Sequence, residues 1–204
     1  EMPGSWFIGD LHFGHEKVAA LRGFAETGLH DLTIQHKWRR QVAEDDIVYV
    51  LGDLSSGSTS GELRALGIIE LLPGRKRLVS GNHDSVSSIH RRMSPNMDAF
   101  RHVFESIQDF GRIRIEREEV LMSHYPYKSQ GDGPGRGITR YEQFRLPDLG
   151  APLIHAHTHH SHPFNGSAGK NEMCVSWDAW KRLVNLGDVQ RWLIDRKEAR
   201  NGTR

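Results

Sequence analysis

The chain has 204 residues, a length that predicts one ordinary domain over 1–204. Hydrophobic residues make up 37% of it and charged residues 26%, which is typical of a soluble globular protein and excludes an intrinsically disordered chain. The 27 Lys and Arg nearly balance the 26 Asp and Glu, so the net charge of +1 provides no long-range attraction to a polyanion and disfavours an obligate nucleic-acid partner.

Strands and helices alternate in the first half of the chain, a pattern that predicts parallel α/β structure. Short apolar runs that close in glycine and polar residues predict buried strands over 6–11, 47–51 and 78–80. Apolar residues at helical spacing predict helices over 31–44 and 63–72, the first capped by Asp31. None of these runs approaches the roughly 18 apolar residues of a membrane span, so membrane insertion is excluded.

Apolar runs follow one another more closely in the second half, which predicts an antiparallel or mixed sheet there. We expect short strands over 100–104, 107–115, 120–123, 153–157 and 173–177, and a terminal helix over 188–197. Trp38 and Trp192 fall on apolar helical faces and are candidates for the core.

A glycine-rich segment over 128–150 interrupts the strands and predicts a long loop. It begins shortly after His124, and its arginines are groups that bind phosphate well. Arg136 and Arg140 are therefore candidates for substrate binding, with Arg145 as a further cation. The alternative is a solvated loop with scattered charge.

Side chains of metal-ligating type follow several of the predicted strands. They are Asp10 and His12, then Asp53, then Asn82, His83 and Asp84, then His124, then His157 and His159. In open α/β sheets, sites form outside the carboxyl ends of strands, so we expect these side chains to converge. Asp10 with His12 and His157 with His159 are spaced at i and i+2, which places each pair on one side of an extended backbone.

Imidazole nitrogen combined with carboxylate and amide oxygen suits borderline divalent cations such as Mn, Fe, Co or Zn rather than Ca. Cys174 is the single cysteine, so the sequence holds neither an internal disulfide nor the Cys cluster of a structural zinc. The number of ligands exceeds the needs of one ion. Two ions that share a carboxylate are the simplest interpretation.

These residues resemble the motifs of the calcineurin-like metallophosphoesterase superfamily. That family carries five blocks in the order Asp-x-His, Gly-Asp, Gly-Asn-His-Asp or Glu, His, and Gly-His-x-His. This chain reads in the same order Asp10-Leu11-His12, Gly52-Asp53, Gly81-Asn82-His83-Asp84, His124 and Ala156-His157-Thr158-His159. The start of the chain is also similar to that of short, single-domain bacterial and phage-borne members. A single block is a weak signal, but the ordered set is a very specific one.

The resemblance implies an α/β fold in four layers, an α/β/β/α sandwich of two facing mixed sheets with the metals at one edge. It implies two divalent metal ions from the series Mn, Fe, Co, Ni and Zn, with Mn favoured for activity. One ion would be held by Asp10, His12 and His159 and the other by Asn82, His124 and His157, with Asp53 bridging both.

The implied reaction is hydrolysis of a phosphate ester by a hydroxide formed between the two cations, since one cation alone can take the pKa of water from about 16 to about 7. His83 would stabilise or protonate the leaving alkoxide, and Asp84 would orient the His83 imidazole. No side chain is phosphorylated in this scheme.

Ala156 departs from the family pattern, because it replaces the glycine of the last block. If that glycine requires a positive φ, alanine strains the turn by roughly 1 kcal/mol or more. Both histidines of the block remain, so we expect a shifted geometry rather than a lost site.

Several functions remain open at this point. A phosphodiesterase acting on small or cyclic nucleotide-like diesters is favoured, because His83 can assist a poor alkoxide leaving group. A phosphomonoesterase or a nuclease of the same superfamily is the alternative, and a non-catalytic interaction scaffold is less favoured because no ligand is missing. The expected partner is a small phosphoester, with a nucleotide as one candidate. The oligomeric state is open.

The lone cysteine and the lack of a charged and then apolar N-terminal segment favour a reducing, cytoplasmic location. Among the other histidines, His15 either faces the site or caps a following helix. His155 shares one side of its strand with His157, where packing or a simple hydrogen bond is favoured over support of a metal ligand. Further histidines are expected to be solvated, namely His30, His36, His90 and His102.

Overall fold

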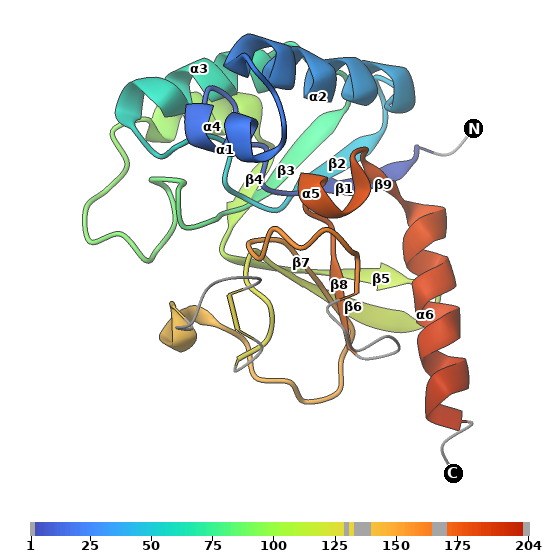
Figure 1. Ribbon diagram of the computed structural model, residues 1–204. Coiled ribbons are helices and arrows are strands. Elements are labelled where there is room, and N and C mark those ends of the chain that lie inside the picture. Colours follow the sequence, from blue (N-terminus) through green and yellow to red (C-terminus); the bar gives the residue numbers. More distant parts are fainter. Residues whose placement is uncertain (1–2, 129–130, 133–139, 165–170, 202–204) are drawn as a thin grey trace.

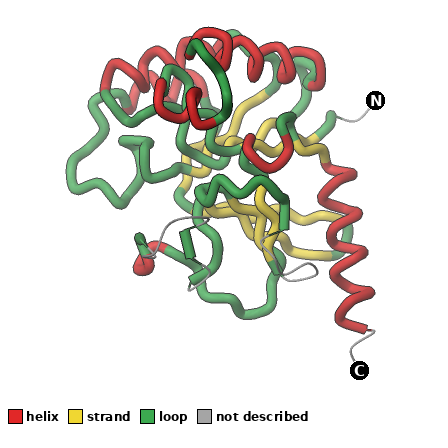
Figure 2. Tube along the Cα trace, viewed as in Figure 1, coloured by secondary structure: helices red, strands yellow, loops and turns green. Residues whose placement is uncertain are grey.

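The computed structural model describes residues 3–128, 131–132, 140–164 and 171–201. Two sheets face each other, with most helices lying over the outer face of the first sheet and one long helix running along the side of the pair (Figure 1). The tube view shows that loops gather where the strands of both sheets end (Figure 2). The predicted α/β class with two mixed sheets is confirmed.

The first sheet has the strand order β4-β3-β2-β1-β9. Its strands are β1 (Ser5–Ile8), β2 (Ile47–Val50), β3 (Arg75–Val79), β4 (Ser106–Gln108) and β9 (Val184–Asn185). The first four are parallel and β9 is antiparallel to β1, as in Phe7 opposite Val184. Parallel pairing brings the carboxyl ends of β1, β2 and β3 to one edge, where their following loops meet.

The second sheet has the order β5-β6-β7-β8. Its strands are β5 (Phe110–Ile115), β6 (Glu118–Ser123), β7 (Leu153–His155) and β8 (Glu172–Cys174). β5 and β6 form an antiparallel hairpin, and β7 and β8 are parallel to β6. Beyond the strand ends, Gly9 pairs with Ser176 in an isolated parallel bridge that joins the two sheets.

Six α-helices and one short 3₁₀ helix complete the described structure. They are α1 (Glu16–Leu21), α2 (Thr27–Gln41), α3 (Thr59–Glu70), α4 (Met97–Val103), η1 (Glu142–Phe144), α5 (Trp177–Trp180) and α6 (Leu186–Asn201). The predicted helices over 63–72 and 188–197 correspond to α3 and α6. Within the described ranges, no helix is both long and apolar enough to cross a membrane.

Two apolar clusters hold the layers together. The first lies between the helices and the first sheet and includes Trp38 of α2, which is fully buried as predicted. The second lies between the two sheets, where Val189, Trp192 and Leu193 of α6 also pack. Full burial of one such side chain contributes about 1.5–3 kcal/mol, so the first cluster holds the helices on the first sheet and the second holds the two sheets together.

The predicted strand over 100–104 is wrong, because this segment belongs to helix α4. Phe100 and Phe104 lie at i and i+4 with their rings stacked at 6.3 Å, which is helical rather than strand spacing. The predicted strand over 107–115 is divided between the two sheets at Asp109. The carboxylate of Asp109 accepts a hydrogen bond from the Ser80 hydroxyl at 2.7 Å, at the point where the chain leaves β4 for β5.

Helix α2 begins at Thr27, so Asp31 lies within the helix and is not its cap. The buried carboxylate of Asp31 instead accepts a hydrogen bond from the Gly14 backbone at 3.0 Å. His30 was expected to be solvated, but it is fully buried between Asp31, at 2.8 Å, and Arg22, at 2.9 Å. A charged network thus ties α2 to the loop that follows β1.

Ala156 does not carry a left-handed backbone, since the positive φ of this turn, 68°, falls on His157. Ala156 is fully buried against Gly9 of the facing sheet. A Cβ added at Gly9 would lie 2.4 Å from the Ala156 Cβ. The missing side chain at Gly9 therefore accommodates the methyl group at Ala156.

This packing predicts a compensating pair of substitutions. Gly9→Ala should lower the free energy of unfolding by about 1–3 kcal/mol, because the added methyl group overpacks the space between the sheets. Adding Ala156→Gly should recover most of this loss, which urea denaturation of the single and double variants would measure. Additive losses in the double variant would contradict the proposed contact.

Candidate metal centre

The loops after the strands bring together all the predicted ligand-type residues at one edge of the two sheets. Asp10 and His12 follow β1, and Asp53 follows β2. The others follow β3, β6 and β7, namely Asn82, His83, Asp84, His124, His157 and His159. Within the described residues, potential ligand atoms gather in two groups, in each of which they all lie within 4.8 Å of one another: Asp10, His12 and His159, and Asp53, His124 and His157.

The backbone that presents these residues is left-handed rather than extended, contrary to the i and i+2 expectation. The φ values lie between 50° and 68° at Asp10, His12, Asp53, His157 and His159. Such a backbone costs about 1–3 kcal/mol per non-glycine residue and persists where the surrounding structure enforces it. The concentration of this strain at predicted ligands marks the edge as a functional site.

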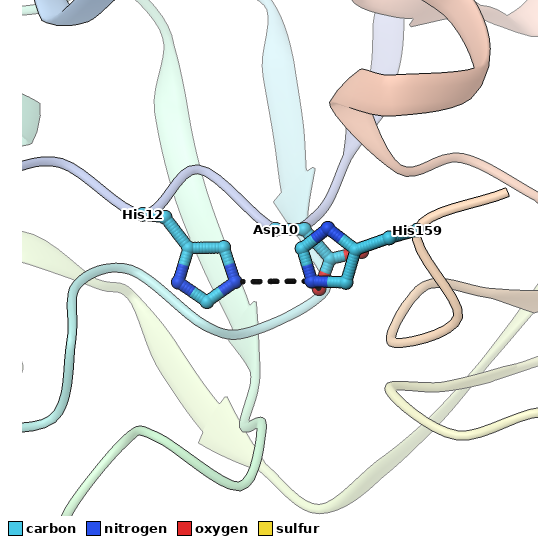
Figure 3. Close-up of side chains that lie close together, drawn as sticks. All are labelled: Asp10, His12 and His159. Carbon is cyan, nitrogen blue, oxygen red and sulfur yellow. Dashed lines mark hydrogen bonds and ion pairs between the residues drawn. The ribbon is translucent and has the colours of Figure 1, made fainter. Parts of the chain in front are cut away.

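The first group is shown in Figure 3. The Nε2 atoms of His12 and His159 face each other at 3.3 Å, and His159 Nε2 lies 4.0 Å from Asp10 Oδ1. Asp10 also accepts a hydrogen bond from the backbone N–H of His157 at 2.9 Å. The carboxylate is thus fixed by the same turn that presents the second group.

In the second group, His124 Nε2 lies 3.2 Å from His157 Nδ1 and 3.5 Å from Asp53 Oδ1. The other oxygen of Asp53, Oδ2, lies 3.7 Å from His12 Nε2 of the first group. Asp53 therefore stands between the two groups, in the place expected of a bridging ligand. Asn82 Oδ1 is buried beside them and has no hydrogen-bond partner among the described residues, which leaves this oxygen available to a cation.

The four histidines are oriented by oxygen acceptors at their outward nitrogens. His12 Nδ1 donates to the Ser55 carbonyl at 3.0 Å, and His124 Nδ1 to the Leu51 carbonyl at 2.7 Å. His159 Nδ1 lies 2.8 Å from Asp178 Oδ2, and His157 Nε2 lies 3.4 Å from Asp132 Oδ1. Because an oxygen acceptor fixes the proton on the outward nitrogen, the inward nitrogen of a neutral ring presents a lone pair to the site.

The donor set fits divalent cations. Metal–nitrogen bonds are about 2.1 Å long, so two imidazole nitrogens bound at right angles to one cation lie about 3 Å apart. The inward nitrogen pairs of the two groups, at 3.3 and 3.2 Å, are close to this spacing. Mixed imidazole, carboxylate and amide donors favour borderline metals over Ca²⁺.

Burial and charged neighbours shift the pKa values of the site residues in different directions. Burial lowers the pKa of His159, but the nearby carboxylates Asp10 and Asp178 outweigh it and the pKa is raised. Burial, together with His159 and Arg22, keeps the pKa of His12 well below its ordinary value, so His12 is neutral. Burial and the neighbouring Asp53 raise the pKa of Asp84 to about 6.

Close contact between two glycines brings the loops after β2 and β3 together. Gly52 has φ +79°, and a Cβ there would lie 2.4 Å from the Gly81 nitrogen. A Cβ at Gly81 would lie 2.3 Å from Asp53 Oδ1. Both motif glycines are therefore required for Asp53 and Asn82 to approach one site.

The carboxylate of Asp84 does not orient His83, contrary to the prediction. It accepts hydrogen bonds from the backbone N–H groups of Asp53, Leu54 and Gly81, at 2.9, 3.0 and 2.7 Å. His83 Nδ1 instead lies 3.0 Å from the Ser56 carbonyl, and its Nε2 lies 3.9 Å from Asp53 Oδ2. Asp84 holds the two loops together, and the Ser56 carbonyl orients the imidazole.

The two histidines left open by the sequence have different environments. His15 occupies the N-cap position of α1 without a side-chain capping bond, and its ring lies 5.3 Å from His12 and 6.2 Å from His83. It therefore faces the site. His155 is buried with Nδ1 at 2.8 Å from the Ala156 carbonyl, and burial lowers its pKa to about 3, so it is a neutral, hydrogen-bonded core residue.

A pocket of about 250 Å³ opens over the two groups. It is lined by Asp53, Asn82, His83, Arg140, His157 and His159. Arg140 of the 128–150 loop thus reaches the site, as the sequence predicted. Arg145 does not, because its buried guanidinium pairs with Asp132. Arg136 lies outside the described residues.

Three charged residues at the site were missed from the sequence. Asp178 and Arg22 form a buried pair at 2.7 Å behind His159, and Asp132 lies behind His157. Each is isolated in the sequence and belongs to none of the motif blocks, so no spacing pattern indicated it. Only the folded structure reveals them, because Asp178 and Asp132 each lie beside the outward nitrogen of a candidate ligand.

Comparisons with known proteins agree with this geometry. Residues 7–199 match the profile of the calcineurin-like phosphoesterase superfamily domain. The gene 66 protein of Mycobacterium phage L5 is 38% identical over 92% of this chain and 93% of its own length, and that of phage D29 is 36% identical over 97% and 99%. A crystal structure of a protein of unknown function, AQ665 from Aquifex aeolicus, superposes with a TM-score of 0.69 at 23% identity, covering 93% of this chain and 98% of that one.

The chain therefore belongs to the calcineurin-like phosphoesterase superfamily. This family hydrolyses phosphate esters with divalent metals, and the two groups of ligand-type residues match that chemistry. Fold, site and family together define a metallophosphoesterase.

The role of Asp84 predicts a loss of stability. Asp84→Ala should lower the free energy of unfolding by about 1–3 kcal/mol, because it removes both acceptor oxygens and leaves three buried backbone N–H groups unpaired. Urea denaturation of the metal-free protein would measure the change. Asp195→Ala, at an exposed side chain, is the control and should change the free energy of unfolding by about 0.5 kcal/mol at most. Equal stability of the Asp84 and Asp195 variants would contradict the role of Asp84.

Proposed function

We propose that this chain is a phosphodiesterase that uses two divalent metal ions to hydrolyse small or nucleotide-like phosphodiesters. Membership of the superfamily supports a phosphoester hydrolase. The arrangement of the described site residues supports the finer assignment. A small phosphoester is the proposed partner, with Mn favoured among the candidate metals.

The observation that carries the proposal is the convergence of imidazole nitrogens in both groups. Every one of the four histidines has an oxygen acceptor at its outward nitrogen. Its inward nitrogen faces another histidine at 3.2 or 3.3 Å, with Asp10 and Asp53 alongside. Nitrogen and carboxylate ligand atoms gathered this closely form a binding site for a cation. The buried, unpartnered Asn82 Oδ1 supports the same conclusion.

When bound there, the two cations would lower the pKa of water and neutralise phosphate oxygens. Asp10, His12 and His159 would hold one of them, and Asn82, His124 and His157 the other, with Asp53 shared between the two. Arg140 at the rim would bind a phosphate oxygen and orient the ester.

We assign to His83 the transfer of a proton to the leaving group. The Ser56 carbonyl retains the proton on Nδ1, so Nε2 is the atom that gains and gives up the second proton. Its side chain is 37% exposed and lines the pocket. An alkyl phosphate ester expels an alkoxide that needs a proton, so this group supports hydrolysis of esters with poor leaving groups, the proposed diesters among them.

Metal content tests the first part of the proposal. Protein purified without chelator should contain about two divalent ions per chain. Asp53→Asn should lose metal and most activity, because the shared negative charge disappears. Asp45→Asn, at an exposed position, is the control. Elemental analysis and hydrolysis of a chromogenic diester are the measurements; a fully active Asp53→Asn variant would refute the assignment, and activity confined to monoesters would indicate a phosphomonoesterase.

The role of His83 predicts a dependence on the leaving group. His83→Ala should keep its metal and lose about 10²–10⁴-fold in kcat on diesters with alkyl leaving groups. The loss should be smaller for an activated aryl leaving group, which departs without a proton. His90→Ala, at an exposed histidine nearby, should match wild type. An equal loss for both kinds of leaving group would assign His83 to phosphate binding instead.

A further inference from the structure

Asp132 is a buried carboxylate of the 128–150 loop that none of the family motifs contains. Its Oδ1 accepts from the Arg145 guanidinium and lies 3.4 Å from His157 Nε2. Its Oδ2 accepts from Arg140 Nε at 2.7 Å. One carboxylate thus contacts both a residue proposed to hold metal and a residue proposed to bind phosphate.

We propose that Asp132 is a positioning residue that fixes Arg140 and His157 relative to each other. Binding of the substrate phosphate by Arg140 and binding of a metal ion by His157 then depend on the same carboxylate, that of Asp132. The inference rests on the proposed function and extends it to the 128–150 loop. Asp132 itself touches neither metal nor substrate in this arrangement.

Arg145 holds Asp132 in place. Its buried guanidinium donates to the carbonyls of Gly131, at 2.9 Å, and Arg140, at 3.1 Å, and lies 5.8 Å from the Tyr125 ring. These contacts join Gly131, which precedes Asp132, and Arg140 to the strand end that carries His124. A buried carboxylate requires such paired donors, because an unpaired buried charge costs several kcal/mol by order of magnitude.

The terminal guanidinium nitrogens of Arg140 are available to bind a group in the pocket. Its Nε and backbone N–H are used on Asp132, while its side chain is 44% exposed and lines the pocket beside Asn82 and His157. Its terminal nitrogens have no hydrogen-bond partner in the described part of the chain. A guanidinium held at Nε presents those nitrogens as a fork, the geometry that binds phosphate oxygens in pairs.

Asp178 provides a matched contrast on the other side of the site. It accepts from His159 Nδ1 at 2.8 Å, as Asp132 does from His157. Its arginine, Arg22, has a side chain only 2% exposed and donates inward to the carbonyls of Asp10 and Leu11. Asp178 therefore orients a candidate ligand without presenting a cation to the pocket.

Three variants separate these roles: Asp132→Asn, Asp178→Asn and Arg140→Ala. Titration calorimetry would measure Mn²⁺ binding to each metal-free protein, and inorganic phosphate binding to each protein saturated with Mn²⁺. Asp178→Asn should weaken Mn²⁺ binding about 10–100-fold, the usual effect of removing a carboxylate behind a ligand, with phosphate affinity unchanged. Arg140→Ala should weaken phosphate binding about tenfold or more and leave Mn²⁺ affinity unchanged. Asp132→Asn should weaken both.

A double-mutant cycle tests whether Asp132 acts through Arg140. In the Arg140→Ala background, Asp132→Asn should cause no further loss of phosphate affinity, whereas independent effects would add and overturn the proposal. A lower melting temperature with both affinities unchanged would also overturn it, as a purely structural role. If Asp132→Asn does not fold, Asp132→Glu should show smaller losses of both affinities.

The outcomes distinguish this inference from the proposed function. A wild-type protein that binds no Mn²⁺ would refute both. A wild type that binds Mn²⁺, with an Asp132→Asn variant that loses Mn²⁺ affinity alone, would refute the link to Arg140 and leave the proposed function standing.

Discussion

The site depends on one constraint: four imidazoles and two carboxylates are gathered at one edge of the two sheets with their potential ligand atoms close together. Each ring is oriented by an oxygen acceptor at its outward nitrogen. Burying carboxylates close together is unfavourable without a cation, and beside the ligands burial and the neighbouring Asp53 raise the pKa of Asp84 to about 6. The surrounding fold must therefore supply the free energy that keeps the ligands together before metal binds.

That free energy comes from burial of the apolar clusters on both faces of the first sheet. It offsets the cost of the left-handed backbone at the edge where the site lies. Left-handed candidate ligands follow the strands at this edge, as Asp10 does between β1 and its bond to His157. Glycines also allow the close approach of chain segments near the site. Two loops meet where Gly52 contacts Gly81, and two sheets meet where Gly9 contacts Ala156. Close packing behind the site therefore maintains the strained backbone that presents the candidate ligands.

The sequence predicted the chemistry of this edge better than its geometry. The alternation of strands and helices was sufficient to predict the α/β class. The ordered motif blocks were sufficient to predict which residues converge at the site. The segment over 100–104 was mistaken for a strand because two phenylalanines four residues apart fit both the strand and the helical period until packing selects one. His30 was misplaced because its burial depends on Arg22 and Asp31, which meet it only in the folded chain. Asp132 and Asp178 escaped notice for the same reason, since isolated carboxylates carry no periodic signal.

The motif blocks and the carboxylates that support them lie in different parts of the chain. The blocks lie at the ends of packed strands, where rigid backbone fixes the positions of the candidate ligands. The carboxylates beside His157 and His159 come from elsewhere, one from the loop that carries Arg140 and one from helix α5. Under the proposed function, a change of the cations in that loop would alter which ester is bound without moving the motif residues, provided that the contact of Asp132 with His157 is kept. The loop residues that also support a candidate ligand would therefore limit how far substrate recognition can vary.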